Sequence, residues 1–571
     1  MMMQLATLIH EYDDISALLA AFLTWIEVRD ASSISCGAYE SAFRRRFVRK
    51  SCLHLPPSAP FASAFVSSLH LQARNAIRSI DIADAESIRC LACLPAVKRL
   101  RVRGGVLHAP FALNQTVLHE AGALRANLTR LDLTSSSVDD ISGLHGAPQL
   151  KTLNLSDTPV SDFTVLETLA TLEYLNLQQT QVTDIGFLRS TPNLHELNLN
   201  ATKQLADLHP ISCLTRLRSV YLSKKHITTL TPLLPSASTL TLLQLVWTQF
   251  DDDIMDEWRM LFSKLTELDH LNMLGVKQLT SLAPLSQLTK LKYLNIQACR
   301  VDILTPLHTL QNLETLVLGW SNAYDFTVLR SLQKLKRLDA QGKQLKSVEF
   351  LPELEYFKGY GTLPRLPKTG RLQEVSFCFS DDSFTFRLAA LPFLRSLSLS
   401  GKLDLQVVAQ SVPTLRQLEL FITETLDVSV VAQLKQLRKL TIRYSSVPEK
   451  AQDYSFLKNL TLLRQLRILN STIDDLSLLE RMKFLKVLTV ESSFLDSISP
   501  VQRLQALEQI DLARTSVADV SALLHLPSLA RIVLPEGADC SALVSQYGTE
   551  RPKLREVMHG NQNCIWSSLH R

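Results

Sequence analysis

The sequence has 571 residues, of which 46% are hydrophobic and 20% are charged, with 17 glycines and 23 prolines. This balance is typical of folded chains and excludes a disordered or collagen-like protein. The formal net charge of +5 is small for such a length, so neither nucleic acid nor an anionic membrane is the expected partner.

The first residues show neither a secretory nor a membrane-spanning pattern. Glu11, Asp13 and Asp14 precede a short apolar run, whereas a secretory signal places positive charge there and a membrane span needs about 20 apolar residues. The nine cysteines are odd in number and scattered, unlike those of a disulfide framework. We therefore expect reduced thiols in an intracellular protein, cytoplasmic rather than nuclear, with no membrane partner.

Residues 1–76 are expected to form a small helical cap. The stretches "DISALLAAFLTWIEV" and "GAYESAFRRRFVRK" have the apolar spacing of helices, and a repeat array needs its open apolar end covered. The stretch "FLTWIEVRDASSISCGAYESAFRR" (22–45) also resembles an F-box, a small helical module that docks proteins to a ubiquitin ligase, although the usual Leu-Pro opening is missing. The segment is therefore either a plain cap or an F-box-like module.

A repeat with a usual period of 22 or 23 residues follows. "LKTLNLSDTPVSDFTVLETLAT" (150–171) leads directly into "LEYLNLQQTQVTDIGFLRSTPN" (172–193), and about 21 such LxxLxL units run through 77–553, with starts predicted at Leu100 and Leu466 among others. Self-similarity at a fixed period indicates a repeat architecture, and the period rather than the chain length then sets the fold.

Each unit reads as a short strand, a turn and a short helical segment. In 150–171, Leu153 and Leu155 alternate with polar residues as on a strand with one buried face. Val160 and Phe163 are expected to point inward, and Asp162 to cap the helical segment. One unit cannot bury its apolar side alone, but stacked units share a core in which each buried leucine contributes roughly 1.5–3 kcal/mol.

These units resemble the leucine-rich repeats, most closely the 22-residue class of phosphatase regulatory subunits and bacterial internalins. The resemblance implies an α/β fold: a right-handed solenoid over 77–553 with a parallel concave sheet and short convex helices, followed by a C-terminal tail, 554–571. Where the family usually has Asn after LxxLxLxx, this chain mostly has Thr, Ser or Cys, such as Thr158. These smaller groups can hydrogen-bond the neighbouring turn but offer fewer donors.

Three regions depart from the period. The unit 240–267 carries "DDDIMDEWRM" and the unit 437–465 carries "VPEKAQDYSFLKN", and both insertions are expected to form loops on one face. The region 335–371 holds two shortened units and several glycines, which predicts irregular stacking. This region is either a hinge or merely an irregular turn.

Motifs that carry chemistry are missing from the sequence. It contains no P-loop and no nucleophile elbow, and its histidines do not cluster with carboxylates. Cys90 and Cys93 form a lone CxxC, whereas structural zinc needs four ligands. The sequence therefore predicts no enzyme, no cofactor and no metal site.

The second, third, fifth and seventh positions of each unit should face solvent on the concave sheet. Aromatic and arginine side chains there are the best candidates for partner contacts, because such residues dominate binding energy at interfaces. The predicted aromatic anchors are Tyr174, Tyr221, Trp247, Tyr293, Trp320, Tyr356 and Tyr360. The alternative is that each ring lies flat on its neighbour and only covers the sheet.

A basic column is predicted towards the C-terminal end. It comprises the second-position residues of five successive units and two further cations: Arg395, Arg416, Arg438, Arg467 and Lys486, with Lys439 and Arg443. Stacked in register, these charges would attract an acidic partner. The alternative is a solvated rim.

The sequence thus predicts a non-catalytic scaffold that binds a protein partner on its concave face, alone or within a larger complex. The alternative function is a substrate receptor of a ubiquitin ligase, in which residues 15–47 bind the ligase adaptor and the repeats select the target.

Overall fold

A computed structural model of the chain describes residues 124–535 with short gaps, and several short segments on either side. The gaps are 225, 252–253, 363, 368–369, 380–390, 392, 402–403, 424–425, 449–451, 493–494 and 496. The outlying segments are 53–55, 79–82, 97–102, 111–112, 537–539, 541, 543, 556–559 and 562–563. The F-box-like stretch, the CxxC pair and nearly all of the predicted cap lie outside these residues.

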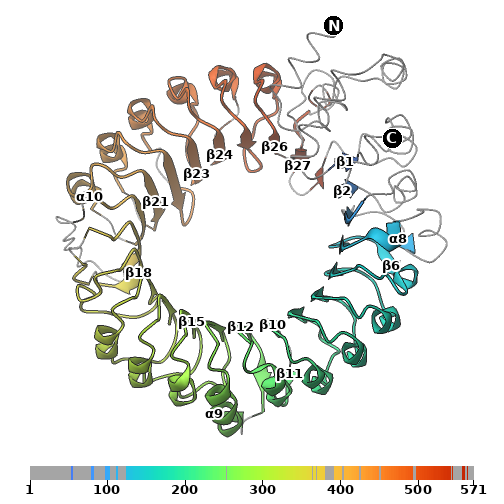
Figure 1. Cartoon of the computed structure of the whole chain (residues 1–571). Helices are drawn as coiled ribbons and strands as arrows, with labels where there is room; N and C mark the ends of the chain where they lie inside the picture. Colours follow the sequence, from blue (N-terminus) through green and yellow to red (C-terminus); the bar gives the residue numbers. More distant parts are fainter. Residues whose placement is uncertain are drawn as a thin grey trace, which may run out of the picture. The chain divides into compact units, whose positions relative to one another are not determined.

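The chain divides into two units, which we describe separately. The first unit is Met1–Leu313 with Ser321–Ser331, and the second is Glu314–Trp320 with Leu332–Arg571. In each unit, parallel strands line one side and short helical turns line the other (Figure 1). This arrangement confirms the predicted class of a parallel sheet backed by short helices.

The sheet of the first unit is wholly parallel, with each strand paired to the next along the chain. Its strands are β1 (Leu53–Leu55), β2 (Ser79–Ile82), β3 (Arg99–Val102), β5 (Arg130–Asp132), β7 (Thr152–Asn154), β8 (Tyr174–Asn176), β9 (Glu196–Asn198), β10 (Ser219–Tyr221), β12 (Leu242–Gln244), β14 (His270–Asn272) and β15 (Tyr293–Asn295). Two short pairs accompany it: β4 (Phe111–Ala112) with β6 (Val138–Asp140), and β11 (His226–Ile227) with β13 (Gln249–Phe250).

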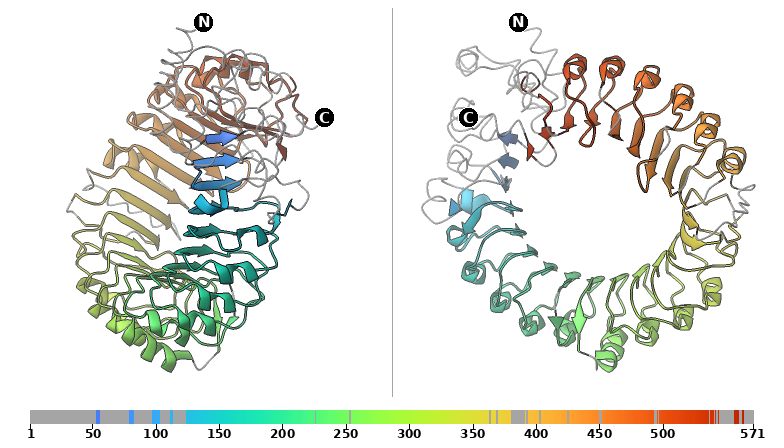
Figure 2. Two further views of the ribbon diagram at one scale, coloured as in Figure 1. Left: turned by 45° about the vertical axis from the view of Figure 1, so that its right-hand side comes forward. Right: turned by 180° about the vertical axis from the view of Figure 1, so that it is seen from behind.

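The second unit continues the same pattern, and its strands lie side by side in Figure 2. They are β16 (Thr315–Val317), β17 (Arg337–Asp339), β18 (Tyr356–Gly361), β19 (Glu374–Phe379), β20 (Ser396–Ser400), β21 (Gln417–Ile422), β22 (Lys439–Tyr444), β23 (Gln465–Ser471), β24 (Val487–Ser492), β25 (Gln509–Asp511), β26 (Arg531–Leu534), β27 (Glu556–His559) and β28 (Gln562–Asn563). Consecutive strands pair in parallel except for the antiparallel pair β27 and β28.

Most of the expected short helices are single 3-10 turns. In the first unit they are η2 (Ser142–Leu144), η3 (Thr164–Thr168), η4 (Gly186–Ser190), η5 (His209–Cys213), η6 (Thr231–Ser236), η7 (Ala283–Gln287), η8 (Thr305–Thr309) and η9 (Thr327–Ser331). In the second unit they are η10 (Ser429–Gln433), η11 (Ser455–Asn459), η12 (Ser477–Leu479), η13 (Ser499–Arg503) and η14 (Ser521–His525). The α-helices among the described residues are α8 (Leu124–Asn127), α9 (Ile254–Lys264) and α10 (Leu405–Ser411).

The predicted core is confirmed in the unit 150–171. Leu153 and Leu155 are fully buried, and Val160 and Phe163 are buried beside them. Leu153 lies opposite Leu175 on the next strand, so the same apolar position stacks on itself from coil to coil. Burial of the repeated leucines is therefore the main stabilising term of the fold.

Two predicted unit starts are three residues late. The register places Leu100 opposite Ile80 and Leu466 opposite Leu440, which puts both residues at the fourth position. Those units therefore begin at Val97 and Leu463. The error arises because "LLRQLRIL" satisfies LxxLxL only approximately in either frame, and pairing with the neighbouring strand decides the frame. The sheet also starts before 77 and continues past 553, because β1 and β27 pair in register with it.

The first insertion forms a helix, so the predicted loop is wrong there. In α9, Ile254, Trp258, Leu261 and Phe262 are buried on one face. Their spacing of three to four residues is that of an amphipathic helix, and acidic residues in the first turn favour its N-terminus. In the second insertion, the described residues include the 3-10 turn η11. Across 335–371, β17, β18 and β19 pair without a register shift, and the hinge stays a prediction.

Six of the small residues that replace the family's Asn make the expected hydrogen bonds: Thr158, Thr180, Thr202, Thr248, Cys299 and Thr515. The Thr158 hydroxyl donates to the Leu155 carbonyl in its own turn at 2.7 Å, whereas Thr248 donates to Leu222 of the preceding coil at 2.6 Å. The Cys299 thiol likewise donates to the Met273 carbonyl at 3.0 Å. In these coils the turn after the strand is thus tied either to itself or to the neighbouring coil.

In many coils a short strand goes with Asn or Asp at the fifth position of the unit, although β10, β12 and β16 are equally short with Tyr, Gln and Val there. In eight strands this residue is Asn or Asp, its side-chain oxygen accepts the N–H two residues on, and the strand ends after three residues. None of β18 to β24 has Asn or Asp there, and these strands run for five to seven residues. The side-chain hydrogen bond draws the backbone into a turn and competes with the backbone hydrogen bonds between strands.

An aspartate precedes most 3-10 turns and accepts the N–H two residues later, as predicted for Asp162. The Asp162 carboxylate accepts from the Thr164 amide at 2.9 Å, and Asp453 accepts from the amide and the hydroxyl of Ser455 at 2.7 and 2.8 Å. Both hydrogen bonds hold the pKa of Asp453 below its ordinary value, and the bond from the Ser455 amide has the larger effect. The pKa values of Asp475 and Asp519 are lowered in the same way.

These aspartates should make the fold sensitive to acid. The pKa of these carboxylates is lower in the folded chain than in the unfolded chain, where it is about 4. They therefore stabilise the fold above about pH 4, and this stabilisation is lost as the pH falls towards their folded-state pKa. We expect the triple variant Asp453→Asn, Asp475→Asn, Asp519→Asn to unfold more easily than wild type at pH 7, with a smaller difference at pH 3. Urea unfolding at both pH values tests this, and an equal difference at both would contradict it.

Candidate interaction surface

The side chains at the second position of the units form a column on the exposed edge of each sheet. The register is fixed because each second-position amide donates to the second-position carbonyl of the preceding coil, as from Glu173 to Lys151 at 2.8 Å and from Arg438 to Arg416 at 2.7 Å. The Cα atoms of neighbouring second-position residues are therefore one strand spacing apart, about 4.8 Å. We call this set the position-2 column.

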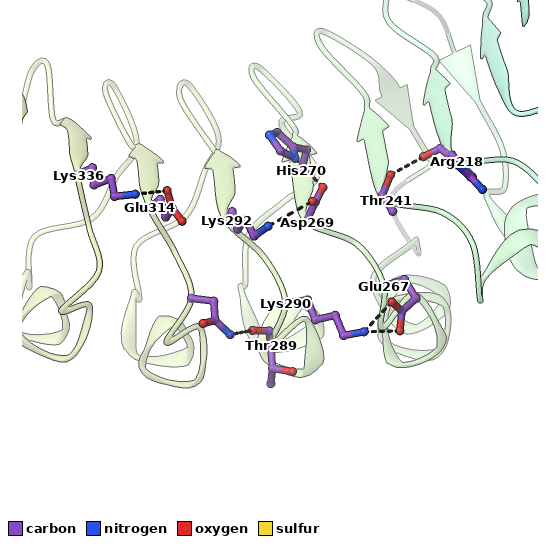
Figure 3. Close-up of polar contacts among 11 residues, drawn as sticks. Arg218, Thr241, Glu267, Asp269, His270, Thr289, Lys290, Lys292, Glu314 and Lys336 are labelled. Carbon is purple, nitrogen blue, oxygen red and sulfur yellow. Dashed lines mark hydrogen bonds and ion pairs between the residues drawn. The ribbon is translucent and has the colours of Figure 1, made fainter. Parts of the chain in front are cut away.

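Every lysine of this column from Lys151 to Lys486 lies beside an acid on an adjacent strand. The ion pairs are Lys151 with Glu173 at 2.7 Å, Lys292 with Asp269 at 3.9 Å, Lys336 with Glu314 at 2.7 Å and Lys486 with Glu508 at 2.6 Å. Figure 3 shows the pairs of Lys292 and Lys336, with the Lys290–Glu267 pair outside the column. All are at least partly exposed to solvent, and such surface ion pairs contribute little to stability.

Four arginines on consecutive strands of the second unit depart from this pattern of lysine–acid pairs. Arg395, Arg416, Arg438 and Arg464 follow one another in the column, and all four side chains are exposed. None of them forms an ion pair with the residues that the structure describes. Like charges about 5 Å apart in water repel by roughly 1 kcal/mol per pair. We call these four residues the arginine ladder.

The predicted basic column needs one correction. Arg467 lies at the fifth position, opposite Thr441, and Arg464 occupies the second position in its place, because the unit begins at Leu463. Lys486 does follow in the column, where Glu508 pairs with it. The two further cations lie on the same face: Lys439 at the third position, and Arg443 at the seventh with its guanidinium 5.8 Å from the centre of the Phe421 ring.

The seven predicted aromatic anchors do not share one column. Tyr174, Tyr293 and Tyr356 occupy the third position, whereas Tyr221 lies at the fifth and Tyr360 at the seventh. Both tryptophans lie at the eighth position, where the chain turns after the strand. Tyr174, Tyr221, Trp247 and Tyr293 belong to the first unit, and Trp320, Tyr356 and Tyr360 belong to the second.

Several of these rings pack on neighbouring coils. The Tyr293 ring stacks on His270 with centroids 5.8 Å apart, and the Arg337 guanidinium lies 4.2 Å from the centre of the Tyr356 ring. For these two tyrosines, the structure agrees with the alternative in which each ring covers its neighbour.

The two tryptophans combine packing with exposure. Trp247 and Trp320 have φ values of 54° and 62°, in the left-handed region, and their indoles lie over Gly275 and Gly342 at the same position of the next coil. A Cβ on Gly275 would lie 2.3 Å from the Trp247 ring, so glycine is required for this contact. The residues nevertheless remain 48% and 56% exposed, which leaves one face of each indole free for a partner.

A cluster that the sequence analysis missed lies on β8 to β10. Glu196 is half buried between Tyr174 and Tyr221, and burial raises its pKa, although the hydrogen bond with Tyr221 opposes that shift. Burial is the main cause that raises the pKa of both tyrosines, and the negative charge of Glu196 raises it further. The available signal was an acid at the third position between two strands that each carry a tyrosine on the same face.

Among the residues described, no group of three or more His, Cys, Asp or Glu side chains is placed to hold a metal ion. Cys213, Cys299 and Cys378 are free thiols, and burial raises the pKa of Cys299 to about 12. No helix in the described part of the chain is both long and apolar enough to span a membrane.

Comparison with known proteins finds a family match for one part of the repeat array. Residues 170–212 match a family model described as leucine-rich repeats, two copies. An internalin from Listeria monocytogenes is 22% identical, over 70% of this chain and 93% of that one, with a TM-score of 0.31. A leucine-rich-repeat protein from Leptospira interrogans is 18% identical, over 79% and 100%, with a TM-score of 0.34.

A plant receptor is also similar. The ectodomain of the receptor kinase GASSHO1/SCHENGEN3 from Arabidopsis thaliana, solved with CASPARIAN STRIP INTEGRITY FACTOR 2, is 15% identical, over 80% of this chain and 66% of that one, with a TM-score of 0.38. None of the curated proteins matches the chain.

Proposed function

We propose that this chain, in which residues 170–212 match leucine-rich repeats and the same pattern recurs along the sequence, is a non-catalytic scaffold that holds a protein partner on its exposed sheet face. Proteins of this kind generally serve as interaction scaffolds rather than enzymes. The partner is a protein rather than nucleic acid or a membrane. The chain acts inside the cell, in the cytoplasm rather than the nucleus, alone or within a larger complex.

The observation that carries this proposal is the pair of half-exposed tryptophans. Each indole is held on a glycine of the next coil, so its rotamer is restricted before any partner arrives. Binding then costs less side-chain entropy, and large aromatic side chains in fixed positions are typical interface anchors. The predicted tyrosines Tyr174, Tyr221, Tyr293, Tyr356 and Tyr360 lie half exposed on the same sheet faces and extend the proposed contact area.

Affinity capture of the full chain from cell extract, followed by mass spectrometry, tests this function. The double variant Tyr293→Ala, Trp320→Ala should recover at least tenfold less of the specific partner than wild type. Tyr324→Ala is the matched control, because that ring is highly exposed but lies off the strands. Thermal unfolding of each variant checks that the fold is kept. An unchanged set of captured proteins, or an equal loss with the control, would sink the proposal.

The same capture decides the alternative of a ubiquitin-ligase substrate receptor. That function rests on residues 15–47, which lie outside the described part of the chain, so no contact in the structure favours it. Recovery of an Skp-type adaptor with the full chain, and its loss on deleting residues 1–47, would support the receptor. Capture of a partner without any adaptor would leave the plain scaffold.

A further inference from the structure

We propose that the arginine ladder binds a short acidic segment of the protein partner, whose apolar side chains dock on the adjoining rim. This inference rests on the proposed function and specifies the chemistry of the partner. It starts from Arg395, Arg416, Arg438 and Arg464, whose four guanidinium groups lie in register on neighbouring strands and form no ion pair with any described residue. Guanidinium groups bind carboxylates with two parallel hydrogen bonds, so a row of them favours a row of Asp or Glu side chains.

The ladder is short and has closed ends. The three gaps between its four strands span about 14 Å at about 4.8 Å each, which is the length of about four to five extended residues. On one side the column continues to Gln373 and then Glu355, and on the other to Lys486, which Glu508 neutralises. The net positive charge of the column therefore ends with the ladder, which limits the length of an acidic segment bound there.

Exposed apolar side chains lie directly beside the ladder. Phe393, Leu462 and Phe484 each precede a ladder residue or Lys486 by two positions, with one buried leucine between. They are 58%, 39% and 56% exposed. The Phe393 ring is held against Gly370 of the preceding coil. Apolar rings beside arginines are typical of the core of a protein interface.

Nucleic acid fits this surface less well than an acidic peptide. A phosphate backbone carries continuous negative charge, and beyond the ladder it would meet Glu355 on one side and the mutually neutralised Lys486–Glu508 pair on the other. Glu419, exposed at the fifth position of β21, adds a negative charge beside the ladder itself. A short segment with carboxylates in the middle and apolar residues to one side avoids these repulsions.

Fluorescence anisotropy with the full chain tests the inference. The probe is a labelled 12-residue peptide of alternating glutamate and leucine flanked by serine, and the comparison probes are its glutamine analogue and a 12-nucleotide single-stranded DNA. We expect the acidic peptide to bind at least tenfold tighter than the other two. Its affinity should fall with rising salt, because the contacts are between exposed charges.

Charge reversal then locates the site. The double variant Arg416→Glu, Arg438→Glu should weaken the acidic peptide at least tenfold, and its thermal stability should stay at or above the wild-type value because repulsion in the ladder is relieved. The control Arg189→Glu, Arg218→Glu makes the same change in net charge at exposed positions of the first unit and should leave binding unchanged. Equal weakening by both variants, no binding of the acidic peptide, or tighter binding of the DNA would overturn the inference.

This test separates the inference from the proposed function. If the captured partner depends on Tyr293 and Trp320 but not on Arg416 and Arg438, the scaffold function holds and the arginine ladder is not its acidic-segment site. If the partner depends on both pairs of residues, both proposals are supported.

Discussion

Replacing Trp258 with alanine is expected to lower the free energy of unfolding by about 3–5 kcal/mol, the usual loss when a large buried aromatic side chain is removed. Trp258 is fully buried in α9 and makes edge-to-face contacts with Phe250 and Phe262, at centroid distances of 5.0 and 6.3 Å. The resulting cavity would lie between the inserted helix and its coil. Chemical unfolding followed by far-UV circular dichroism measures the loss.

Two substitutions control for this effect. Met260→Ala changes an exposed side chain on the same helix and should alter stability by no more than about 0.5 kcal/mol. Trp258→Phe should cost clearly less than Trp258→Ala, because it keeps most of the ring and removes an indole N–H that has no partner among the described residues. If Trp258→Ala cost no more than Met260→Ala, the helix would not be packed on the repeats as described.

Gly275→Ala is the second substitution with a large expected effect. Gly275 has a φ of 73°, and an alanine there carries about 1–2 kcal/mol of left-handed strain. In addition, its Cβ would lie 2.3 Å from the Trp247 indole and must displace that ring. We therefore expect the loss of stability to exceed the strain alone, together with a change in Trp247 fluorescence. Equilibrium unfolding gives the first quantity and emission spectra give the second.

A double-mutant cycle isolates the displacement of the indole. Gly146→Ala introduces the same kind of strain at a φ of 64° with no atom near the new Cβ, so it reports strain only. In a Trp247→Ala background, Gly275→Ala should cost no more than Gly146→Ala. Alanine already occupies the left-handed position after a strand at Ala201 and Ala298, which shows that the position tolerates a methyl group when no indole covers it. A cost that is independent of Trp247 would contradict the contact.

The repeat fold could be predicted from the sequence because its determinant is local and periodic. Leu153 and Leu155 recur every 22 or 23 residues with their neighbours, and each copy is buried against the next. The frame was lost at Leu466, where leucines three residues apart make two frames nearly equivalent, and only pairing with Leu440 resolves them. The helix α9 was missed because the sequence reading treated the insertion as a break in the period and did not apply the 3.6-residue spacing within it.

The candidate site was predicted less completely, because it depends on contacts between coils. The packing of Trp320 on Gly342 spans one period of 22 residues and was open to sequence reasoning. Trp247 and Gly275 are 28 residues apart, because α9 lies between them. A search at the fixed repeat period therefore does not pair these two residues. The arginine ladder was found except for Arg464, whose place was given to Arg467 by the error of frame.

The choice of residue at the fifth position has a consequence for how such a protein can change. In eight coils an Asn or Asp there caps the turn and the strand ends after three residues, whereas β18 to β24 lack such a residue and run on. The breadth of sheet offered to a ligand is therefore adjustable one coil at a time, by point substitution, with the leucine framework untouched. A narrow and a broad recognition strip can thus coexist along one backbone, and engineering could widen or trim either without redesigning the core.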